Sequence, residues 1–118
     1  MNTRAVGTDG EEMACQYLAR NGVRIKERNF RCKLGEIDVI GYDEGYLVFF
    51  EIKYRKYSSK GSAVEAVDYR KQKRICKVAD YYRMIHRLGD NTAVRFDVVA
   101  IDAEEIKWFK NSFDYVVN

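Results

Sequence analysis

Two apolar runs joined by a short polar segment constrain the fold of this chain most strongly. Residues 37–40 and 46–52 are rich in β-branched and aromatic side chains, which favour β-strands. Asp43, Glu44 and Gly45 lie between the two runs and are typical of a tight turn. The segment therefore predicts a β-hairpin, whose register depends on where the turn is centred.

The predicted register brings two carboxylates together. With the turn centred between Glu44 and Gly45, a loop of two or of four residues places Asp38 directly opposite Glu51. Side chains alternate along a strand, so Lys53 shares the face that Glu51 occupies. We expect this face to carry chemistry and the opposite, apolar face of the hairpin to join the core.

Two opposed carboxylates need an explanation, because like charges directly across a sheet destabilise it by roughly 0.2–1 kcal/mol. A bound cation removes this cost, and Mg²⁺ is typically held by one or two carboxylates together with waters and phosphate oxygens. Asp38, Glu51 and Lys53 therefore suit a metal and phosphate site. A hairpin whose charges are solvated or salt-bridged explains the pattern equally well, so both interpretations stay open.

Length and composition predict one domain over residues 1–118. The chain has 118 residues with 47% apolar content, enough for one core and too little for two. No stretch reaches the roughly 18 consecutive apolar residues that span a bilayer, and the N-terminus lacks the apolar centre of a secretory signal. The expected location is the cytoplasm, with no membrane partner.

The cysteines and the single histidine exclude two classes of site. Cys15, Cys32 and Cys76 are odd in number and lack Cys-x-x-Cys spacing, and His86 stands alone. These features argue against a structural zinc site and against a histidine-based triad. We expect reduced thiols in or near the core, and His86 at the surface or at a helix end.

The charge is distributed unevenly. Residues 53–77 carry nine basic and two acidic side chains, a balance of +7, whereas the whole chain has a net charge of +3. Such asymmetry is typical of a face that binds a polyanion. A solvated, lysine-rich helix and loop is the alternative interpretation.

The expected elements follow the order αβββαββ, in the mixed α/β class. Helices are expected over about 9–20 and 63–88, and strands over 23–32, 36–42, 46–55, 94–101 and 106–109. Glu11 falls on the inward face of the first helix near its start, although Glu11 and Glu12 can instead form capping boxes with Thr8 and Asp9. Gln72 borders the buried stripe of the second helix, where it reaches the charged face of the hairpin or remains a surface residue.

This arrangement resembles a known enzyme core. A helix with an inward Glu, an Asp in a hairpin strand, a Glu-x-Lys strand and a helix carrying Gln are similar to the PD-(D/E)XK nuclease superfamily, in the form seen in Holliday-junction resolvases. Ile37 stands before Asp38 where a proline is frequent. Over about residues 7–115 the chain also resembles the YraN family of small bacterial proteins, through Gly10-Glu11, Gly35-Glu36-Ile37-Asp38, Phe50-Glu51-Ile52-Lys53, Arg95-Phe96-Asp97-Val98-Val99, Ala14, Tyr17, Leu18, Asn29, Arg55 and Lys71.

The resemblance implies a restriction-endonuclease-like fold and a catalytic metal centre. Asp38 and Glu51 would ligate Mg²⁺ or Mn²⁺ together with the backbone carbonyl of Ile52, and Glu11 would bind the metal through water. Lys53 would orient or activate the attacking water and stabilise the pentavalent phosphate. Gln72 would help to orient the site.

The resemblance also implies nucleic acid, DNA above all, as the partner and a homodimer as an assembly that addresses two strands. Contacts to the sugar-phosphate backbone would come from Arg55, Lys56, Arg70, Lys71, Lys73 and Arg74. Glu36 either completes a second metal site or forms a salt bridge with Lys53 or Arg55. Asp97 is expected to be structural and paired with Arg95 or a neighbouring strand.

Three functions remain in competition at this point. The first is a divalent-metal-dependent endonuclease that hydrolyses phosphodiester bonds in branched or junction DNA during recombination or repair. The second is a catalytically inactive nucleic-acid-binding or accessory protein that keeps the nuclease fold. The third is a protein-interaction module that uses some of the nine tyrosines and six phenylalanines as a partner surface.

Overall fold

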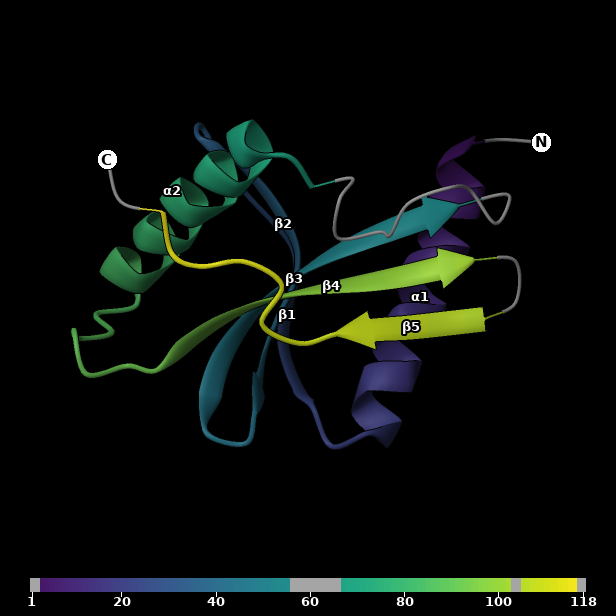
Figure 1. Cartoon of the computed structure of the whole chain (residues 1–118), viewed down its shortest axis with the longest axis horizontal. Helices are drawn as coiled ribbons and strands as arrows, with labels where there is room; N and C mark the ends of the chain where they lie inside the picture. The colour runs from purple at the N-terminus through teal and green to yellow at the C-terminus, as the bar shows by residue number, and fades with distance from the viewer. Residues whose placement is uncertain (1–2, 56–66, 103–104, 117–118) are drawn as a thin grey trace.

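The computed structural model describes residues 3–55, 67–102 and 105–116 (Figure 1), and it describes the side chains of all of these except residues 3–9 and 55. The predicted order αβββαββ is confirmed. The elements are α1 (Thr3–Arg20), β1 (Arg24–Cys32), β2 (Gly35–Asp43), β3 (Tyr46–Arg55), α2 (Tyr69–Ile85), β4 (Val94–Asp102) and β5 (Glu105–Phe109). Among the described residues, no helix is long and apolar enough to cross a membrane.

A five-stranded mixed sheet forms the centre of the molecule, with strand order β1-β2-β3-β4-β5. β3 and β4 pair in parallel, and the other neighbouring strands pair antiparallel. A parallel pair needs a crossover connection, and α2 lies within it. The two helices cover opposite faces of the sheet (Figure 1), an arrangement that is consistent with a restriction-endonuclease-like fold.

The sheet is buried on both faces, so the prediction of one apolar and one chemical face for the hairpin is wrong. Leu47 and Phe49 join the core beneath α2, whereas Val48 and Phe50 join the core beneath α1. A central strand covered on both sides reads as a continuous apolar run rather than as an alternation. Residues 39–42 of β2 and 47–50 of β3 accordingly include no charged side chain.

The turn of the hairpin confirms the predicted register. Asp43 pairs with Tyr46, which leaves a two-residue loop of Glu44 and Gly45. Both loop residues have positive φ, 52° and 86°, as the tight primed hairpin turns require. The pairing runs on to Val39 and Phe50.

Both helix starts differ from the expectation. α1 begins at Thr3, so Thr8 and Asp9 lie inside the helix and the capping-box interpretation is wrong. α2 begins at Tyr69 rather than near residue 63. Its N-cap is Asp68, whose carboxylate accepts a hydrogen bond from the backbone N–H of Lys71 at 2.9 Å.

The thiols and the histidine lie where the sequence predicts. Cys15 and Cys76 are buried, Cys32 is half-buried, and all three are free thiols. His86 is the exposed C-cap residue of α2.

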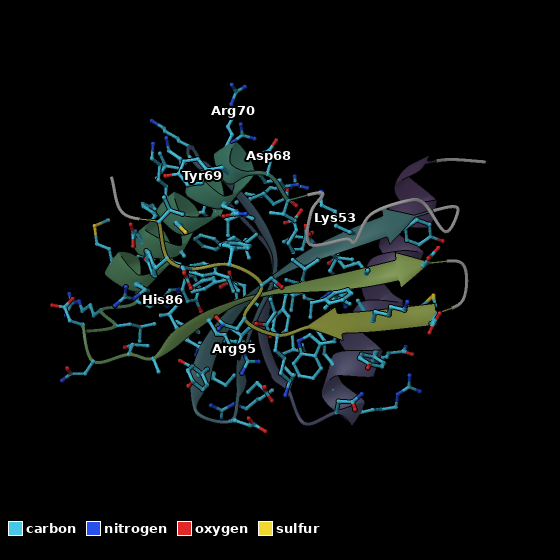
Figure 2. The ribbon with its side chains drawn as sticks, in the orientation of Figure 1. Lys53, Asp68, Tyr69, Arg70, His86 and Arg95 are labelled. Atoms are coloured by element: carbon cyan, nitrogen blue, oxygen red, sulfur yellow. The ribbon has the colours of Figure 1, made fainter. Side chains whose placement is uncertain are left out.

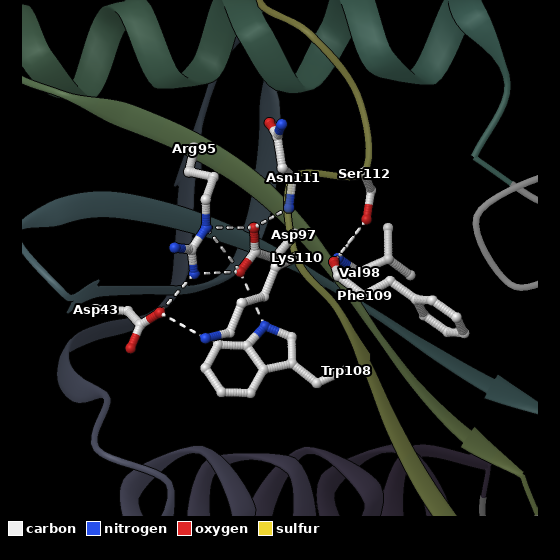
Figure 3. A network of polar contacts seen from close by, with 9 residues as sticks. All are labelled: Asp43, Arg95, Asp97, Val98, Trp108, Phe109, Lys110, Asn111 and Ser112. Carbon is white, nitrogen blue, oxygen red and sulfur yellow. Dashed lines mark hydrogen bonds and ion pairs between the residues drawn. The ribbon is translucent and has the colours of Figure 1, made fainter.

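A buried charge network fastens β5 and the segment after it to the sheet (Figure 3). The Arg95 guanidinium donates to both carboxylate oxygens of Asp97, at 3.0 and 2.8 Å, and to Asp43 at 2.7 Å. Asp97 is fully buried and also accepts from Trp108 Nε1 at 2.8 Å and from the backbone N–H of Asn111 at 2.9 Å. The predicted pairing of Asp97 with Arg95 is confirmed, and four donors to a single carboxylate indicate a structural role.

We expect Asp97→Asn to lower the free energy of unfolding by about 3–5 kcal/mol, because it leaves a buried guanidinium without its main counter-charge. Urea denaturation followed by circular dichroism measures this loss. The exposed Asp90→Asn removes the same charge and should change stability by less than about 0.5 kcal/mol. Equal midpoints for the two variants would contradict the assigned role of the network.

Candidate functional site

A hollow of about 620 Å³ opens where the β1–β2 hairpin, Glu51 of β3 and the first turns of α2 meet. Its lining combines three acidic side chains from the strands with basic side chains from the hairpin and the helix. The lining residues are Arg31, Cys32, Gly35, Glu36, Asp38, Glu51, Lys71, Arg74 and Ile75.

Asp38 stands where β2 and β3 stop pairing. The backbone pairing ends at Val39 and Phe50, and the next opposed pair is Asp38 and Glu51. There the Asp38 carboxylate, rather than a backbone carbonyl, accepts the N–H of Ile52 at 2.8 Å. This hydrogen bond holds the acid against β3 beside Glu51.

Burial and repulsion make Asp38 reluctant to ionise. Its pKa is raised from the ordinary value of 3.8 to about 7, first by burial and then by the charge of Glu51. The hydrogen bond from Ile52 opposes this shift without outweighing it. At neutral pH the carboxyl group therefore lies near the midpoint of its titration.

Glu51 is buried and paired with two ammonium groups. Its side chain is only 8% exposed, and its Oε1 lies 2.6 Å from Lys71 Nζ and 3.7 Å from Lys53 Nζ. Burial lowers the pKa of Lys53, and so does the neighbouring Lys71. For Lys71 burial, the largest single cause, acts in the same direction, but the hydrogen bonds to Glu51 and Lys53 and the charges of Glu51 and Asp38 together outweigh it and raise the pKa.

Lys71 is a site residue that the sequence analysis assigned only to the nucleic-acid backbone. Its backbone N–H is fixed by the Asp68 cap, and its side chain reaches across to Glu51 in the middle of β3. Lys71 precedes Ile75, a buried residue of α2, by one helical turn. That spacing places both residues on the inward face and is the signal that could have identified it.

Gln72 lies elsewhere. Its side-chain amide donates to the backbone carbonyl of Val67 at 2.9 Å, and it does not line the hollow. The resemblance implies that Gln72 orients groups beside the carboxylates. In the structure its side chain instead contacts the segment that leads into α2.

The Glu11 carboxylate forms hydrogen bonds with side chains of β1. It accepts from Asn29 Nδ2 at 2.7 Å and from Arg28 Nε at 3.3 Å, and Arg28 also pairs with Glu12 at 2.8 Å. Glu11 does not line the hollow. Across the part of the chain that the structure describes, no group of three or more His, Cys, Asp or Glu side chains gathers in a way that would hold a metal ion.

Glu36 pairs with a residue that the sequence analysis did not consider. Glu36 and Arg31 approach to 3.3 Å across the exposed end of the β1–β2 hairpin, so a pairing with Lys53 is wrong. The side chain of Arg55, the other expected partner, lies outside the described residues.

The remaining basic residues divide between the hollow and the helix surface. Arg74 lines the hollow, whereas Lys73 lies over the Tyr69 ring at 5.4 Å from its centroid. Figure 2 shows Arg70 at the start of α2, pointing away from the sheet. Lys56 lies outside the described residues.

We expect Asp38→Asn to change how stability depends on pH. Between about pH 4 and 7 the folded protein keeps a proton on Asp38 that the unfolded chain has lost, so stability falls as the pH rises and levels off above 7. Asn cannot ionise, and it retains an oxygen for the Ile52 N–H. The variant should therefore gain roughly 2–4 kcal/mol over wild type between pH 4 and pH 8, measured by urea denaturation in EDTA. The exposed Asp114→Asn is the control. If the free energy of unfolding depended on pH in the same way in wild type and both variants, the raised pKa of Asp38 would be refuted.

We also expect Lys71 and Glu51 to be energetically coupled. In a double-mutant cycle of Lys71→Met and Glu51→Gln, the coupling energy should be about 1 kcal/mol or more, because each single change leaves a charge without its nearest partner. Chemical denaturation of the four proteins measures it. The cycle of Lys73→Met with Glu51→Gln should be additive within about 0.5 kcal/mol, and equal couplings in both cycles would argue against a specific pair.

Comparison with known proteins places the chain in a family. The model described as "Uncharacterised protein family UPF0102" matches residues 10–101. The chain is 46% identical over 114 residues to a UPF0102 protein of Lachnoclostridium phytofermentans, with 97% of each chain covered. It is 42% identical over 113 residues to one of Coxiella burnetii, covering 95% of this chain and 94% of the relative, and 37% identical over 114 residues to one of Legionella pneumophila, covering 95% and 97%. These relatives are named only as members of the family, so the similarity shows the family of this chain and does not show an activity. The chain belongs to the UPF0102 family.

Proposed function

We propose that this protein is a divalent-metal-dependent endonuclease that hydrolyses phosphodiester bonds in branched or junction DNA. One observation carries the proposal. The hydrogen bond from Ile52 holds Asp38 beside Glu51, at the rim of a hollow that Lys71 and Arg74 also line. Asp38 and Glu51, with Glu36 and several cations around the same opening, suit a phosphodiester, which gains negative charge as it is attacked.

The donor set fits Mg²⁺ or Mn²⁺. Asp38 and Glu51 supply hard carboxylate oxygens, and Mg²⁺ is commonly held by one or two such groups with waters and substrate phosphate oxygens. Their mutual repulsion, seen in the raised pKa of Asp38, is the cost that a cation would offset. The Ile52 carbonyl is a further candidate ligand. When bound, the ion would supply Lewis-acid stabilisation of the phosphate and a more acidic water.

Lys53 and Lys71 would serve the phosphate. Both ammonium groups lie within 4 Å of Glu51 Oε1, so a cation that shares this carboxylate would compete with them. Lys53 has a lowered pKa, which suits a group that orients or deprotonates water. Lys71 remains charged and suits binding of a nonbridging oxygen.

Sequence-independent contacts would come from the basic rim. Arg31 and Arg74 line the hollow, and Arg70 points outward from the start of α2. Such side chains hold phosphates without reading bases, which favours recognition of DNA shape. A junction presents two strands to be cut, so the proposal includes a homodimer on the substrate.

The test combines metal binding with cleavage. Titration calorimetry with Mn²⁺ should show binding to wild type and at least about tenfold weaker binding to the Asp38→Asn, Glu51→Gln double variant. On labelled four-way, forked and plain duplex DNA, wild type with Mn²⁺ should cut the branched substrates preferentially. Lys53→Met should keep the metal and lose cleavage on the order of a hundredfold.

Asp114→Asn, an exposed change of charge, serves as the control and should cut like wild type. Metal binding without cleavage of any DNA or RNA structure would refute the proposal that the protein is a nuclease. Salt-sensitive binding that persists in EDTA without cleavage would instead favour the nucleic-acid-binding accessory protein. The ion pair between Lys71 and Glu51, at 2.6 Å, is the observation that supports this accessory role.

A further inference from the structure

A second, apolar hollow lies next to the first along α2. It measures about 300 Å³ and is lined by Leu34, Lys77, Asp80, Tyr81 and Met84. Leu34, Tyr81 and Met84 are 48%, 36% and 66% exposed, a cluster of large apolar side chains on a surface that is otherwise mostly charged. Clusters of this kind mark interaction sites more often than isolated exposed residues do.

The tip of the β1–β2 hairpin separates the two hollows. Cys32 and Gly35 line the charged one, and Leu34 between them lines the apolar one. The tip is held firmly: a Cβ on Gly35, whose φ is +149°, would lie 3.1 Å from the Arg74 side chain and 3.2 Å from Val78. Leu34 is thus placed beside α2 by close packing.

The two hollows share one line of positive charge. Arg74 borders the charged hollow and Lys77, one helical turn further on, borders the apolar one. Within the apolar hollow, the Asp80 carboxylate accepts a hydrogen bond from the Tyr115 hydroxyl, so it is committed to the fold. A strand whose phosphates follow Arg74 and Lys77 would bring its bases to the apolar lining.

Tyr81 is suited to receive a base. Its ring lies 6.3 Å from that of Phe30 on β1, which supports it from the sheet side. Aromatic rings bind unpaired bases by stacking, whatever their identity, and apolar residues such as Leu and Met wedge between bases that have been unstacked. Tyr81 lies seven residues after Arg74, or about 10 Å along the helix axis, which is about three steps of a stacked strand.

We propose that the apolar hollow binds an unpaired nucleobase of the strand whose phosphate occupies the charged hollow. This inference rests on the proposed function and specifies the substrate class as nucleic acid with unpaired nucleotides a few steps from the cut, as at a fork, flap or junction. Tyr81 supplies the stacking face and Leu34 the wedge. Duplex without a branch offers no base to this hollow.

Fluorescence anisotropy in EDTA tests the inference without requiring cleavage. Labelled forked, single-stranded and blunt duplex DNA of equal length are titrated with the full chain. We expect Tyr81→Ala and Leu34→Ala to weaken binding to forked and single-stranded DNA on the order of tenfold and duplex binding less than about twofold. Lys77→Ala should weaken all three alike and reduce the salt dependence.

Tyr69→Ala is the matched control, since Tyr69 is an exposed tyrosine of the same helix outside the hollow and should leave all affinities unchanged. A fork carrying 5-iodouracil at an unpaired position should photo-crosslink to Tyr81 in wild type. Circular dichroism of each variant confirms that it folds, and the crosslink to wild-type protein remains decisive where a variant does not.

The outcomes separate this inference from the proposed function. Preference for unpaired DNA that depends on Tyr81, without cleavage under Mn²⁺, would uphold the base-binding hollow and refute the nuclease. Cleavage of branched DNA that is indifferent to Tyr81 and Leu34 would refute the hollow alone, and so would sedimentation showing that Leu34→Asp dissociates a dimer built on this surface. No binding to any DNA in EDTA, together with no cleavage in Mn²⁺, would refute both.

Discussion

The parallel pairing of β3 with β4 is the constraint on which the rest of this structure depends. Parallel neighbours cannot be joined by a tight turn, so the chain must leave the sheet and return through a crossover that contains α2. This crossover covers one face of the sheet and buries Leu47 and Phe49. It also places Lys71, on the first turn of the helix, against Glu51 in the middle of β3.

The carboxylates of Asp38 and Glu51 lie just beyond the point where the pairing of β2 with β3 stops. Along residues 39–42 of β2 and 47–50 of β3, apolar side chains fill both faces, and an ionised group there would have neither water nor a partner. One step beyond the last pair, Asp38 takes over the role of a backbone acceptor, and Glu51 is compensated by lysines from the strand and the helix. The raised pKa of Asp38 reflects the cost of ionising a buried carboxyl group beside Glu51.

A second group of buried charges, in the first half of β4, is arranged differently. There Asp97 and Arg95 are buried together, and every donor around the carboxylate comes from the fold itself. The Asp97 carboxylate is fully buried, whereas the Asp38 cluster borders a hollow that is also lined by Arg31 and Arg74. The contrast between a satisfied charge cluster and an open one distinguishes a structural centre from a site that can receive a ligand.

Local rules determined much of this protein from sequence alone. The turn residues Glu44 and Gly45 set the hairpin register, and the register set Asp38 opposite Glu51, because side-chain alternation leaves no freedom once the turn is placed. The order of elements, the free thiols and the pairing of Asp97 with Arg95 followed from equally local patterns.

Only the tertiary structure decided which helical residues meet the strands. Lys71 faces Glu51, Gln72 turns to Val67 and Glu11 is taken by Asn29 and Arg28, although all three fall on the sheet-facing side in a helical pattern. The cap at Asp68 sets the rotation and start of α2, and the packing of Gly35 against Arg74 sets its distance from the hairpin. A periodic pattern specifies which side of a helix is buried, but the partner of each side chain depends on the helix's axial position and rotation, which are settled by packing between segments far apart in the chain.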